Sequence, residues 1–334
     1  MANFSQTFKL ITNMDFRHMW QTAKEISVIA RKPTLWILCD MAWCGIRYSA
    51  GYMDYKVFAF YHLNGEQRKT YVTRGINNNL IRKLNNREYW HYFSDKVEFN
   101  RAFAPYLHRE WVSFANLTPE QLETFVGRKP FVIAKPLDSC CGKGVEKIDP
   151  KQFSSVEELY HHLQAIQCGI LEDCIIQHEQ LSTLYPHAVN TVRVATILSS
   201  GTVSIAYAFI RIGSGGNVVD NLNSDGMAAP VNLETGIVEK PAANKKSEIF
   251  RAHPETGTAI IGFHIPYWKE ILSMCREAAK KIPQMRYIGW DVAVTPDGPC
   301  LIEGNQFPGH DILQLPVHVP EKIGLLPKIR TCIW

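Results

Sequence analysis

Several familiar sequence signatures are missing from this chain of 334 residues. No Gly-x-x-x-x-Gly-Lys-Ser/Thr segment opens a helix, so a P-loop is excluded. Residues 1–93 lack the glycine-rich strand–turn–helix of a dinucleotide-binding fold. Neither His-Arg-Asp nor Asp-Phe-Gly follows the glycine-containing loop near residue 142, which disfavours a protein kinase. The chain also has no internal repeats and no low-complexity tracts.

The net charge is also small, and the cysteines are not spaced in metal-binding pairs. The formal net charge is only +4 and the basic residues are scattered, so we do not expect a nucleic-acid binder. The nine cysteines show no paired metal-ligand spacing, and the adjacent Cys140 and Cys141 cannot easily close a normal disulfide. We expect no secretory leader, so free thiols in a reducing cytoplasm are the simplest interpretation.

Long apolar runs are also few. The most apolar early window, Leu35–Ile46, is too short to span a bilayer and contains Asp40, so we interpret it as a buried helix. Residues 4–30 place apolar side chains at helical intervals among scattered basic residues. That pattern fits either a membrane surface or packing on the protein body, and packing is the commoner use. We expect no transmembrane segment.

What the chain does contain is enough apolar sequence for a large core. With 46% hydrophobic residues it can bury such a core and divide into two or three lobes. Residues 1–93 are predicted to be mostly helical. A helix is expected after them, with Ser94 as its N-cap and Lys96 in its first turn, an unfavourable end for a cation. Later predicted elements are a helix over 153–167, strands at Cys174–Gln180, Asn190–Ile197 and Val203–Ile212, a hairpin at Val231–Val238 and a helix at Ile265–Ile282.

A strand, a glycine-containing loop and a return strand are predicted between residues 129 and 148. The apolar strand Phe131–Ala134 ends at Lys135, and the loop carries Gly142 and Gly144. Backbone amides of such a loop can close over phosphates while Lys135 neutralises them. A purely structural hairpin is the alternative, because glycine is common in loops.

A second hairpin is predicted near the end of the chain. Its parts are a strand, a turn and a return strand: Trp290–Thr295, Pro296–Pro299 and Cys300–Asn305. Glu303 and Asn305 are two residues apart and point to one face, which Asp291 on the partner strand can reach. Two carboxylates and an amide oxygen suit a hard cation such as Mg²⁺. An ordinary polar-edged hairpin is the alternative.

Together, these pieces occur in an order that resembles the ATP-grasp superfamily of ATP-dependent carboxylate ligases. More narrowly, the chain resembles the sugar-transfer-associated branch, related to alpha-L-glutamate ligases. The resemblance covers about residues 94–312. It rests on these segments: Asp95-Lys96, Phe131–Pro136 with its glycine loop, Asn190–Arg193, Arg211–Gly216, Val219–Gly226, Gly289–Asp291, Leu301–Asn305 and Pro308-Gly309.

The resemblance implies an α+β fold in which two lobes with antiparallel sheets grip ATP, preceded by a mostly helical N-terminal region. The implied divisions are residues 1–93 (the helical region), 94–180 (the first lobe, with the glycine-rich lid) and 181–334 (the second lobe, with the magnesium and substrate site). The helical N-terminal region departs from the wider superfamily, where an α/β domain usually stands. Because that region often helps to shape the substrate site, the resemblance leaves the substrate open.

The resemblance also implies a role for each matching residue. The catalytic residues would be Arg193, Arg211 and Lys135. Contacts to ATP would come from Lys96, Lys135, the lid residues Ser139, Gly142, Lys143, Gly144 and Val145, and the hinge residues Gln177, His178, Glu179 and Gln180. Asp291, Glu303 and Asn305 would hold one or two Mg²⁺ ions, with Mn²⁺ as a substitute. The substrate would be bordered by Asn221, Ser224, Asp225, Gly226, Gln306, His310 and Asp311.

The implied reaction forms a C–N bond. A carboxylate, such as that of an amino acid, would be activated by ATP as an acyl phosphate and joined to a sugar-linked, peptide or small amine acceptor. Two alternatives remain: a small-molecule kinase on the same fold, and a non-catalytic nucleotide-binding partner in polysaccharide biosynthesis. The sequence leaves a homodimer open.

Overall fold

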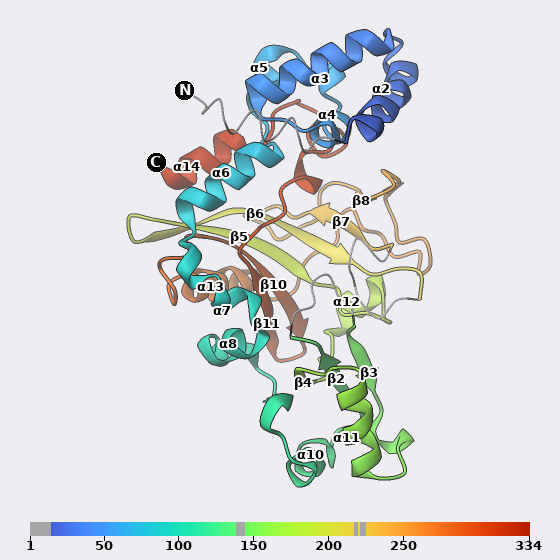
Figure 1. Ribbon diagram of the computed structural model, residues 1–334, viewed down its shortest axis with the longest axis vertical. Coiled ribbons are helices and arrows are strands. Elements are labelled where there is room, and N and C mark those ends of the chain that lie inside the picture. Colours follow the sequence, from blue (N-terminus) through green and yellow to red (C-terminus); the bar gives the residue numbers. More distant parts are fainter. Residues whose placement is uncertain (1–14, 138–143, 217–219, 221–224) are drawn as a thin grey trace. The chain divides into compact units, whose positions relative to one another are not determined.

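The computed structural model describes residues 15–137, 144–216, 220 and 225–334, which form two compact units (Figure 1). The first unit combines the residues up to Lys83 with the C-terminal segment Gly309–Cys332. The second unit is Leu84–Pro308. The three-part division at residues 93 and 180 stays a prediction.

The first unit is helical, as predicted for the N-terminal region. Its helices are α2 (Phe16–Ala30), α3 (Thr34–Tyr48), α4 (Tyr52–Val57), α5 (Gly65–Arg68), α6 (Arg74–Leu84) and α14 (Leu326–Ile333), with 3-10 turns at Phe60–His62 and Ile312–Gln314. An aromatic core made by Tyr55, Phe58, Phe60 and Tyr71 holds the unit together. None of the helices in the described part of the chain combines the length and hydropathy needed to cross a bilayer.

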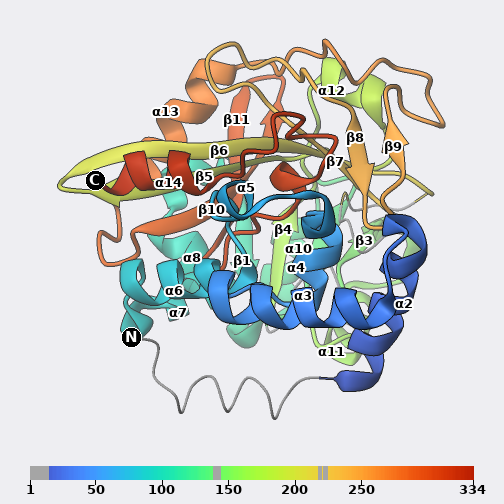
Figure 2. The ribbon, with the colours of Figure 1, turned by 90° about the horizontal axis from the view of Figure 1, so that it is seen from above.

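Helix α3 corrects one sequence-based expectation. The apolar window Leu35–Ile46 does form a helix, but only one of its faces is buried, through Ile37, Met41 and Cys44. The opposite face carries apolar side chains that stay exposed to solvent. The prediction of a buried helix is therefore right about the helix and wrong about one of its faces, because mean hydropathy cannot distinguish the two faces. Figure 2 shows α3 beside α2.

The second unit contains a four-stranded antiparallel sheet in the order β1-β4-β2-β3. Its strands are β1 (Trp111–Ser113), β2 (Val132–Lys135), β3 (Glu146–Ile148) and β4 (Ile170–Asp173). Helices α10 (Pro119–Val126) and α11 (Val156–Ala165) share a core with this sheet. The predicted pairing across the glycine loop is confirmed, because Val132 on β2 lies opposite Ile148 on β3.

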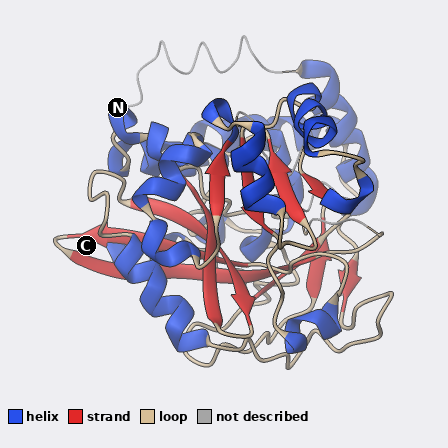
Figure 3. Ribbon diagram, turned by 90° about the horizontal axis from the view of Figure 1, so that it is seen from below, coloured by secondary structure: helices blue, strands red, loops and turns tan. Residues whose placement is uncertain are grey.

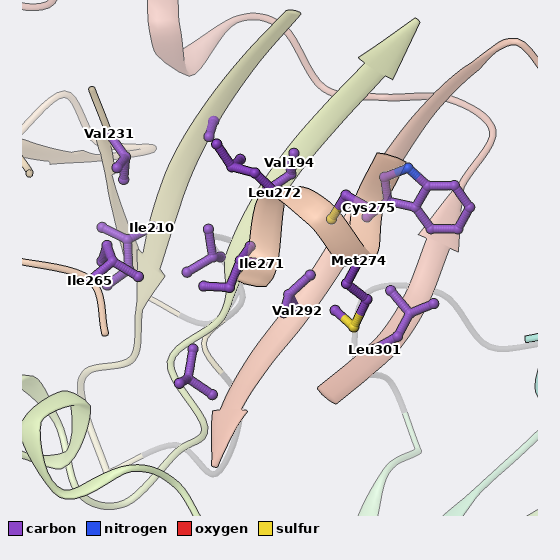
Figure 4. Close-up of a cluster of buried hydrophobic side chains, with 14 of the residues drawn as sticks. Val194, Ile210, Val231, Ile265, Ile271, Leu272, Met274, Cys275, Val292 and Leu301 are labelled. Atoms are coloured by element: carbon purple, nitrogen blue, oxygen red, sulfur yellow. The ribbon is translucent and has the colours of Figure 1, made fainter. Parts of the chain in front are cut away.

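The second unit also contains a seven-stranded antiparallel sheet in the order β11-β10-β5-β6-β7-β8-β9. Figure 3 shows the strands in red. Its strands are β5 (Val192–Ser199), β6 (Thr202–Ile212), β7 (Met227–Pro230), β8 (Ala242–Asn244), β9 (Ile249–Phe250), β10 (Tyr287–Thr295) and β11 (Gly298–Asn305). Helix α13 (Trp268–Ala278) packs on this sheet, with Ile271 and Cys275 among the strand residues Val194, Val292 and Leu301 (Figure 4). The predicted hairpin of β10 and β11 is confirmed.

Short helices lie before the smaller sheet and between the two sheets, and their bounds correct two local predictions. They are α7 (His91–Ser94), α8 (Lys96–Ala102), α9 (Ala104–Leu107) and α12 (Glu179–Leu184), with 3-10 turns at Arg87–Tyr89, Phe114–Asn116 and Pro150–Gln152. The N-cap of α8 is Asp95, not Ser94, because the Asp95 carboxylate accepts from the amides of Val97 and Glu98. Cys174–Gln180 is not a strand: β4 ends at Asp173 and α12 begins at Glu179.

Candidate functional site

The hairpin of β10 and β11 brings the three expected metal ligands together. Its register places Asp291 opposite Glu303 and Gly289 opposite Asn305, with an irregularity directly after Asp291. The side-chain nitrogen of Asn305, Nδ2, lies 3.2 Å from Glu303 Oε1 and 3.4 Å from Asp291 Oδ2. The three side chains therefore converge on one face of the hairpin.

Two arginines from the neighbouring strands meet the same carboxylate. Arg193 on β5 lies opposite Asp291 and binds both of its oxygens, with Nη2 at 2.7 Å from Oδ2. Arg211 on β6 adds a contact of 2.7 Å from its Nη2 to Oδ2. Burial alone would raise the pKa of Asp291, but the two guanidinium groups outweigh it and lower the pKa to about 2. Asp291 is thus a buried anion that fixes both arginines.

Glu303 lies in a different electrostatic environment. Loss of hydration beside the buried Asp291 raises its pKa, and the Asp291 carboxylate raises it further, although the residue as a whole is exposed to solvent. Arg211 and Arg193 act in the opposite direction but do not compensate. A cation placed beside Glu303 would relieve this unfavourable charge.

Asp220 and Thr191 extend the network, and sequence reasoning gave them no role. The Asp220 carboxylate accepts hydrogen bonds from the Thr191 amide (2.9 Å) and hydroxyl, and its Oδ2 lies 3.5 Å from Arg211 Nε. Burial raises the pKa of Asp220, while the charge of Arg211 lowers it. Asp220 lies in the sequence segment Val219–Gly226, which carries part of the family resemblance, and that position was the sequence signal that could have identified it.

A second buried cluster surrounds Lys135, at the end of β2. The Lys135 amine forms an ion pair with Glu172 on β4, which also pairs with Arg109 at 3.1 Å. Glu172 is almost fully buried. Burial would raise its pKa, but Lys135 and Arg109 together hold it far below the usual range. The sequence analysis identified Lys135 but missed Glu172 and Arg109, which no local motif marks.

Arg109 joins this cluster to the strand that carries Glu303. Its Nη1 donates to the carbonyl oxygen of Leu301 at 2.6 Å, and its Nη2 lies 3.4 Å from that of Ile302. Lys135, Glu172, Arg109 and β11 thus form a continuous set of polar contacts within the second unit. Lys135 is therefore linked to the carboxylate hairpin through Glu172 and Arg109. Its catalytic role stays a prediction.

The other expected phosphate and lid residues are only partly within the described structure. The Lys96 amine donates to the carbonyl oxygen of Leu137 at 2.9 Å, next to the glycine loop. Gly144 has a φ of +71°, and a Cβ there would lie 2.8 Å from Pro136 Cγ, so glycine suits the site. Val145 follows it and precedes β3. Ser139, Gly142 and Lys143 lie outside the described residues.

The expected hinge residues make contacts within the second unit. The Gln177 side chain donates to the carbonyl oxygens of Tyr185 and Ala188. It accepts a hydrogen bond from the backbone amide of Asn190 at 2.6 Å. The His178 amide donates to the Val294 carbonyl oxygen at 2.8 Å. Glu179 and Gln180 begin α12, and the Gln180 side chain donates to the carbonyl oxygen of His264. Their adenine and ribose contacts stay predictions.

The expected substrate residues are distributed over both compact units. Asp225, which pairs with Lys246 at 2.8 Å, belongs to the second unit together with Gly226 and Gln306. His310 and Asp311 belong to the first unit, where the Nε2 atom of the buried His310 has no hydrogen-bond partner among the described residues. Burial lowers the pKa of His310. Asn221 and Ser224 lie outside the described residues.

The sequence of the chain matches a known protein family. Residues 75–330 match the family described as sugar-transfer associated ATP-grasp. The chain belongs to this family. Membership confirms the expected fold class, with antiparallel sheets preceded by a helical region, and it extends the match beyond the segment at 94–312.

Solved structures of other proteins are similar at low identity. N5-carboxyaminoimidazole ribonucleotide synthetase in its ADP complex is 14% identical, with a TM-score of 0.42 over 66% of this chain and 46% of that chain. The ATP-grasp ligase PsnB with its minimal precursor is 14% identical, with a TM-score of 0.42 over 73% and 64%. D-cycloserine synthetase DcsG is 10% identical, with a TM-score of 0.44 over 74% and 73%. The match spans less than two thirds of the first two proteins. No curated protein sequence matched this chain.

Proposed function

We propose that this ATP-grasp protein is an ATP- and Mg²⁺-dependent ligase that joins a carboxylate to an amine. The observation that carries the proposal is the convergence of Asp291, Glu303 and Asn305 with the buried Arg193 and the partly buried Arg211 on the larger sheet. Family membership supports the nucleotide part of the proposal. The carboxylate that we favour is an amino acid, and the amine is sugar-linked, part of a peptide or small.

The residues at the hairpin fit a divalent metal ion by their chemistry. Glu303 and Asp291 are adjacent carboxylates, and carboxylate and amide oxygens are the ligands that Mg²⁺ prefers. The Asn305 side chain, whose nitrogen faces both carboxylates here, would turn its oxygen toward a bound ion. Within the described residues, no group of three or more His, Cys, Asp or Glu side chains has the arrangement of a metal site. The proposed set is therefore two carboxylates completed by an amide. When bound there, Mg²⁺ would neutralise the phosphate oxygens of ATP.

The arginines and lysines suit the charge problem of the reaction. A carboxylate that attacks the γ-phosphate of ATP is one anion approaching another, so positive charge around both is required. Arg193 and Arg211 are held in place by Asp291 and Asp220, and Lys135 is held by Glu172. Such fixed cations need little reorganisation when charge moves during phosphoryl transfer. We assign Arg193 and Arg211 to the transferred phosphoryl group and Lys135, with Lys96, to the nucleotide phosphates.

The proposed reaction has two steps. A carboxylate oxygen attacks the γ-phosphorus, the bond between that phosphorus and the bridging oxygen breaks, and ADP leaves with the bond's electron pair. The amine then attacks the carbonyl carbon of the acyl phosphate. The tetrahedral intermediate collapses with loss of phosphate, and the amine releases a proton to solvent. One carboxylate oxygen ends in inorganic phosphate, and the products are an amide, ADP and phosphate.

A hydroxylamine assay distinguishes this proposal from its alternatives. The protein is incubated with Mg-ATP, hydroxylamine and a panel of amino acids and other carboxylates, and hydroxamate and ADP are both measured. A ligase forms hydroxamate and ADP together with at least one carboxylate. A phosphorylated hydroxyl compound without hydroxamate would show a kinase. ATP binding without ADP formation across the panel would favour a non-catalytic role in polysaccharide biosynthesis.

A further inference from the structure

Helix α3 presents an apolar face to solvent. Leu35 is 70% exposed, Trp36 42%, Trp43 56% and Ile46 73%. Exposed large side chains of this kind are concentrated in one part of the described chain: nine of the sixteen fall within residues 16–53. Single exposed apolar residues are ordinary, but a continuous set on one helix marks an interaction surface.

The spacing of these residues places them on one side of the helix. At 100° per residue, Leu35, Cys39, Trp43 and Ile46 lie opposite the buried set of Ile37, Met41 and Cys44. The single acidic residue of the helix is turned away from this surface: Asp40 is paired with Arg68 at 2.7 Å and accepts a hydrogen bond from the Tyr55 hydroxyl. The outward face therefore carries no negative charge.

Basic residues border this apolar face. Arg31 and Lys32 precede the helix, and Arg47 lies in its last turn. The Lys32 amine sits 3.9 Å from the centre of the Trp36 ring. Helix α2, which packs beside α3, repeats this pairing of lysine with exposed tryptophan, because the Lys24 amine lies 5.6 Å from the ring centre of Trp20. Tryptophan beside lysine is the combination found where proteins enter the headgroup region of a membrane.

The dimensions of the surface distinguish between its candidate occupants. A helix of 15 residues is about 22 Å long and about 10 Å wide, so α3 offers about 200 Å² and α2 and α3 together offer about 400 Å². A stable protein interface needs about 800 Å² per partner. A lipid surface has no such threshold, because a shallow amphipathic helix gains from apolar insertion and from attraction between its basic residues and anionic headgroups.

We propose that the outward face of α3 docks the protein on a membrane surface that contains anionic phospholipids. Trp36, Trp43, Leu35 and Ile46 insert at the level of the headgroups, and Arg31, Lys32 and Arg47 contact the phosphates. The family match begins at residue 75, so α3 lies outside the segment shared with the family. This docking surface goes beyond the proposed ligase activity and stands whether or not that activity is found.

Vesicle binding tests the docking surface directly. The full-length protein is mixed with phosphatidylcholine vesicles that contain or lack about one quarter phosphatidylglycerol, and the bound fraction is measured by flotation. We expect binding to the anionic vesicles that weakens as salt rises. The double substitution Trp36→Ser and Trp43→Ser should lower binding at least about tenfold, because each exposed ring loses its insertion. Trp334→Ser, at a tryptophan that is 95% exposed, is the matched control and should leave binding unchanged.

Two further measurements separate membrane docking from other uses of the face. Replacing Lys32 and Arg47 with glutamine should weaken binding to anionic vesicles by about fivefold per residue and leave binding to neutral vesicles unchanged. Brominated lipids should quench part of the fluorescence of the eight tryptophans, and this quenching should disappear in the double variant.

Three results would overturn the proposal. The first is wild-type protein that stays unbound at high lipid concentration, and the second is a double variant that binds as the wild type does. The third is a dimer in light scattering that the double substitution abolishes, which would assign the face to a second copy of the chain.

Discussion

At the scale of single residues, the account depends on buried charges that hold each other in place. Asp291 fixes Arg193 and Arg211, and Glu172 fixes Lys135 and Arg109. Buried ion pairs of this kind contribute little net stability, but removal of one partner leaves an uncompensated charge. Their arrangement therefore supports function more directly than it supports folding.

The first prediction concerns Glu303. We expect Glu303→Gln to keep the fold, because the glutamine is isosteric and the residue is exposed to solvent. Turnover should fall at least about a hundredfold, since loss of one preorganised electrostatic group costs about that much. Asp297→Asn is the matched control, because Asp297 is an exposed carboxylate at the turn of the same hairpin. Full activity in Glu303→Gln would contradict the metal assignment.

The second prediction concerns Glu172. Glu172→Gln should lower the free energy of unfolding by about 3–5 kcal/mol, because Arg109 is left buried without its carboxylate. Glu110→Gln is the control: Glu110 also forms an ion pair, with Lys129, but it is 75% exposed and should contribute under about 1 kcal/mol. Urea titrations of both variants measure these differences. An equal loss of unfolding free energy in the two variants would show that burial of the Glu172 cluster does not contribute to stability.

The third prediction concerns pH. The pKa of Asp291 is about 2 in the folded protein, against about 3.9 in the unfolded chain, so its ionised form stabilises the fold above about pH 4. This stabilisation, about 2 kcal/mol, is lost as pH falls toward 2. The stability difference between wild type and Asp291→Asn should therefore narrow by about that amount between about pH 6 and about pH 2. A difference that stays constant with pH would contradict the ion pairs with the arginines.

At the scale of elements, β11 brings the site residues together through a close contact. A Cβ on Gly304, between Glu303 and Asn305, would lie 2.8 Å from ring atoms of Phe93 and 3.1 Å from Phe99. Those rings pack against each other with centres 6.2 Å apart, so they cannot easily move aside. The strand can keep its position only with glycine there.

The fourth prediction follows from that contact. Gly304→Ala should lower the free energy of unfolding by about 1–3 kcal/mol, the usual cost of overpacking. It should also weaken Mg²⁺-dependent nucleotide binding, because the neighbouring proposed metal ligands Glu303 and Asn305 would shift. Gly45→Ala is the control, since its Cβ would meet only the Ala50 oxygen at an ordinary 3.6 Å. Thermal melting and nucleotide titrations at several Mg²⁺ concentrations measure the two effects. Unchanged melting of Gly304→Ala would disprove the close packing of β11.

Element-scale features were also the most predictable from sequence. The hairpin of β10 and β11 could be predicted because its alternation and its turn are local. The cluster of Glu172 with Arg109 could not, because these residues are 63 positions apart and meet only through strand pairing. The apolar outward face of α3 was missed because composition alone does not show which side of a helix is covered.

At the scale of the whole molecule, the first compact unit is built from both ends of the chain. Gln314, in the C-terminal segment, is fully buried. Its side chain accepts from the Val72 amide at 2.8 Å and donates to the Val72 carbonyl oxygen at 3.0 Å. Sequence patterns predicted the helices of this unit, but they could not show that residues 309–332 pack with them, because that pairing is non-local.

The fifth prediction tests this construction. Gln314→Ala should lower stability by about 2–4 kcal/mol, because it leaves the backbone groups of Val72 buried and unsatisfied. Hydrogen exchange should rise in residues 15–83 and 309–332 more than in residues 84–308, since local opening follows compact units. Gln164→Ala, at an exposed position of the second unit, is the control. A uniform rise across the chain would show that the two units unfold as one.

The most direct test of the proposed ligase reaction follows the carboxylate oxygen. A carboxylate that yields hydroxamate in the panel is labelled with ¹⁸O and incubated with Mg-ATP and an amine acceptor. Activation through an acyl phosphate predicts one ¹⁸O atom in the inorganic phosphate for each amide formed, and none in ADP. Amide formed together with unlabelled phosphate would contradict the proposed mechanism.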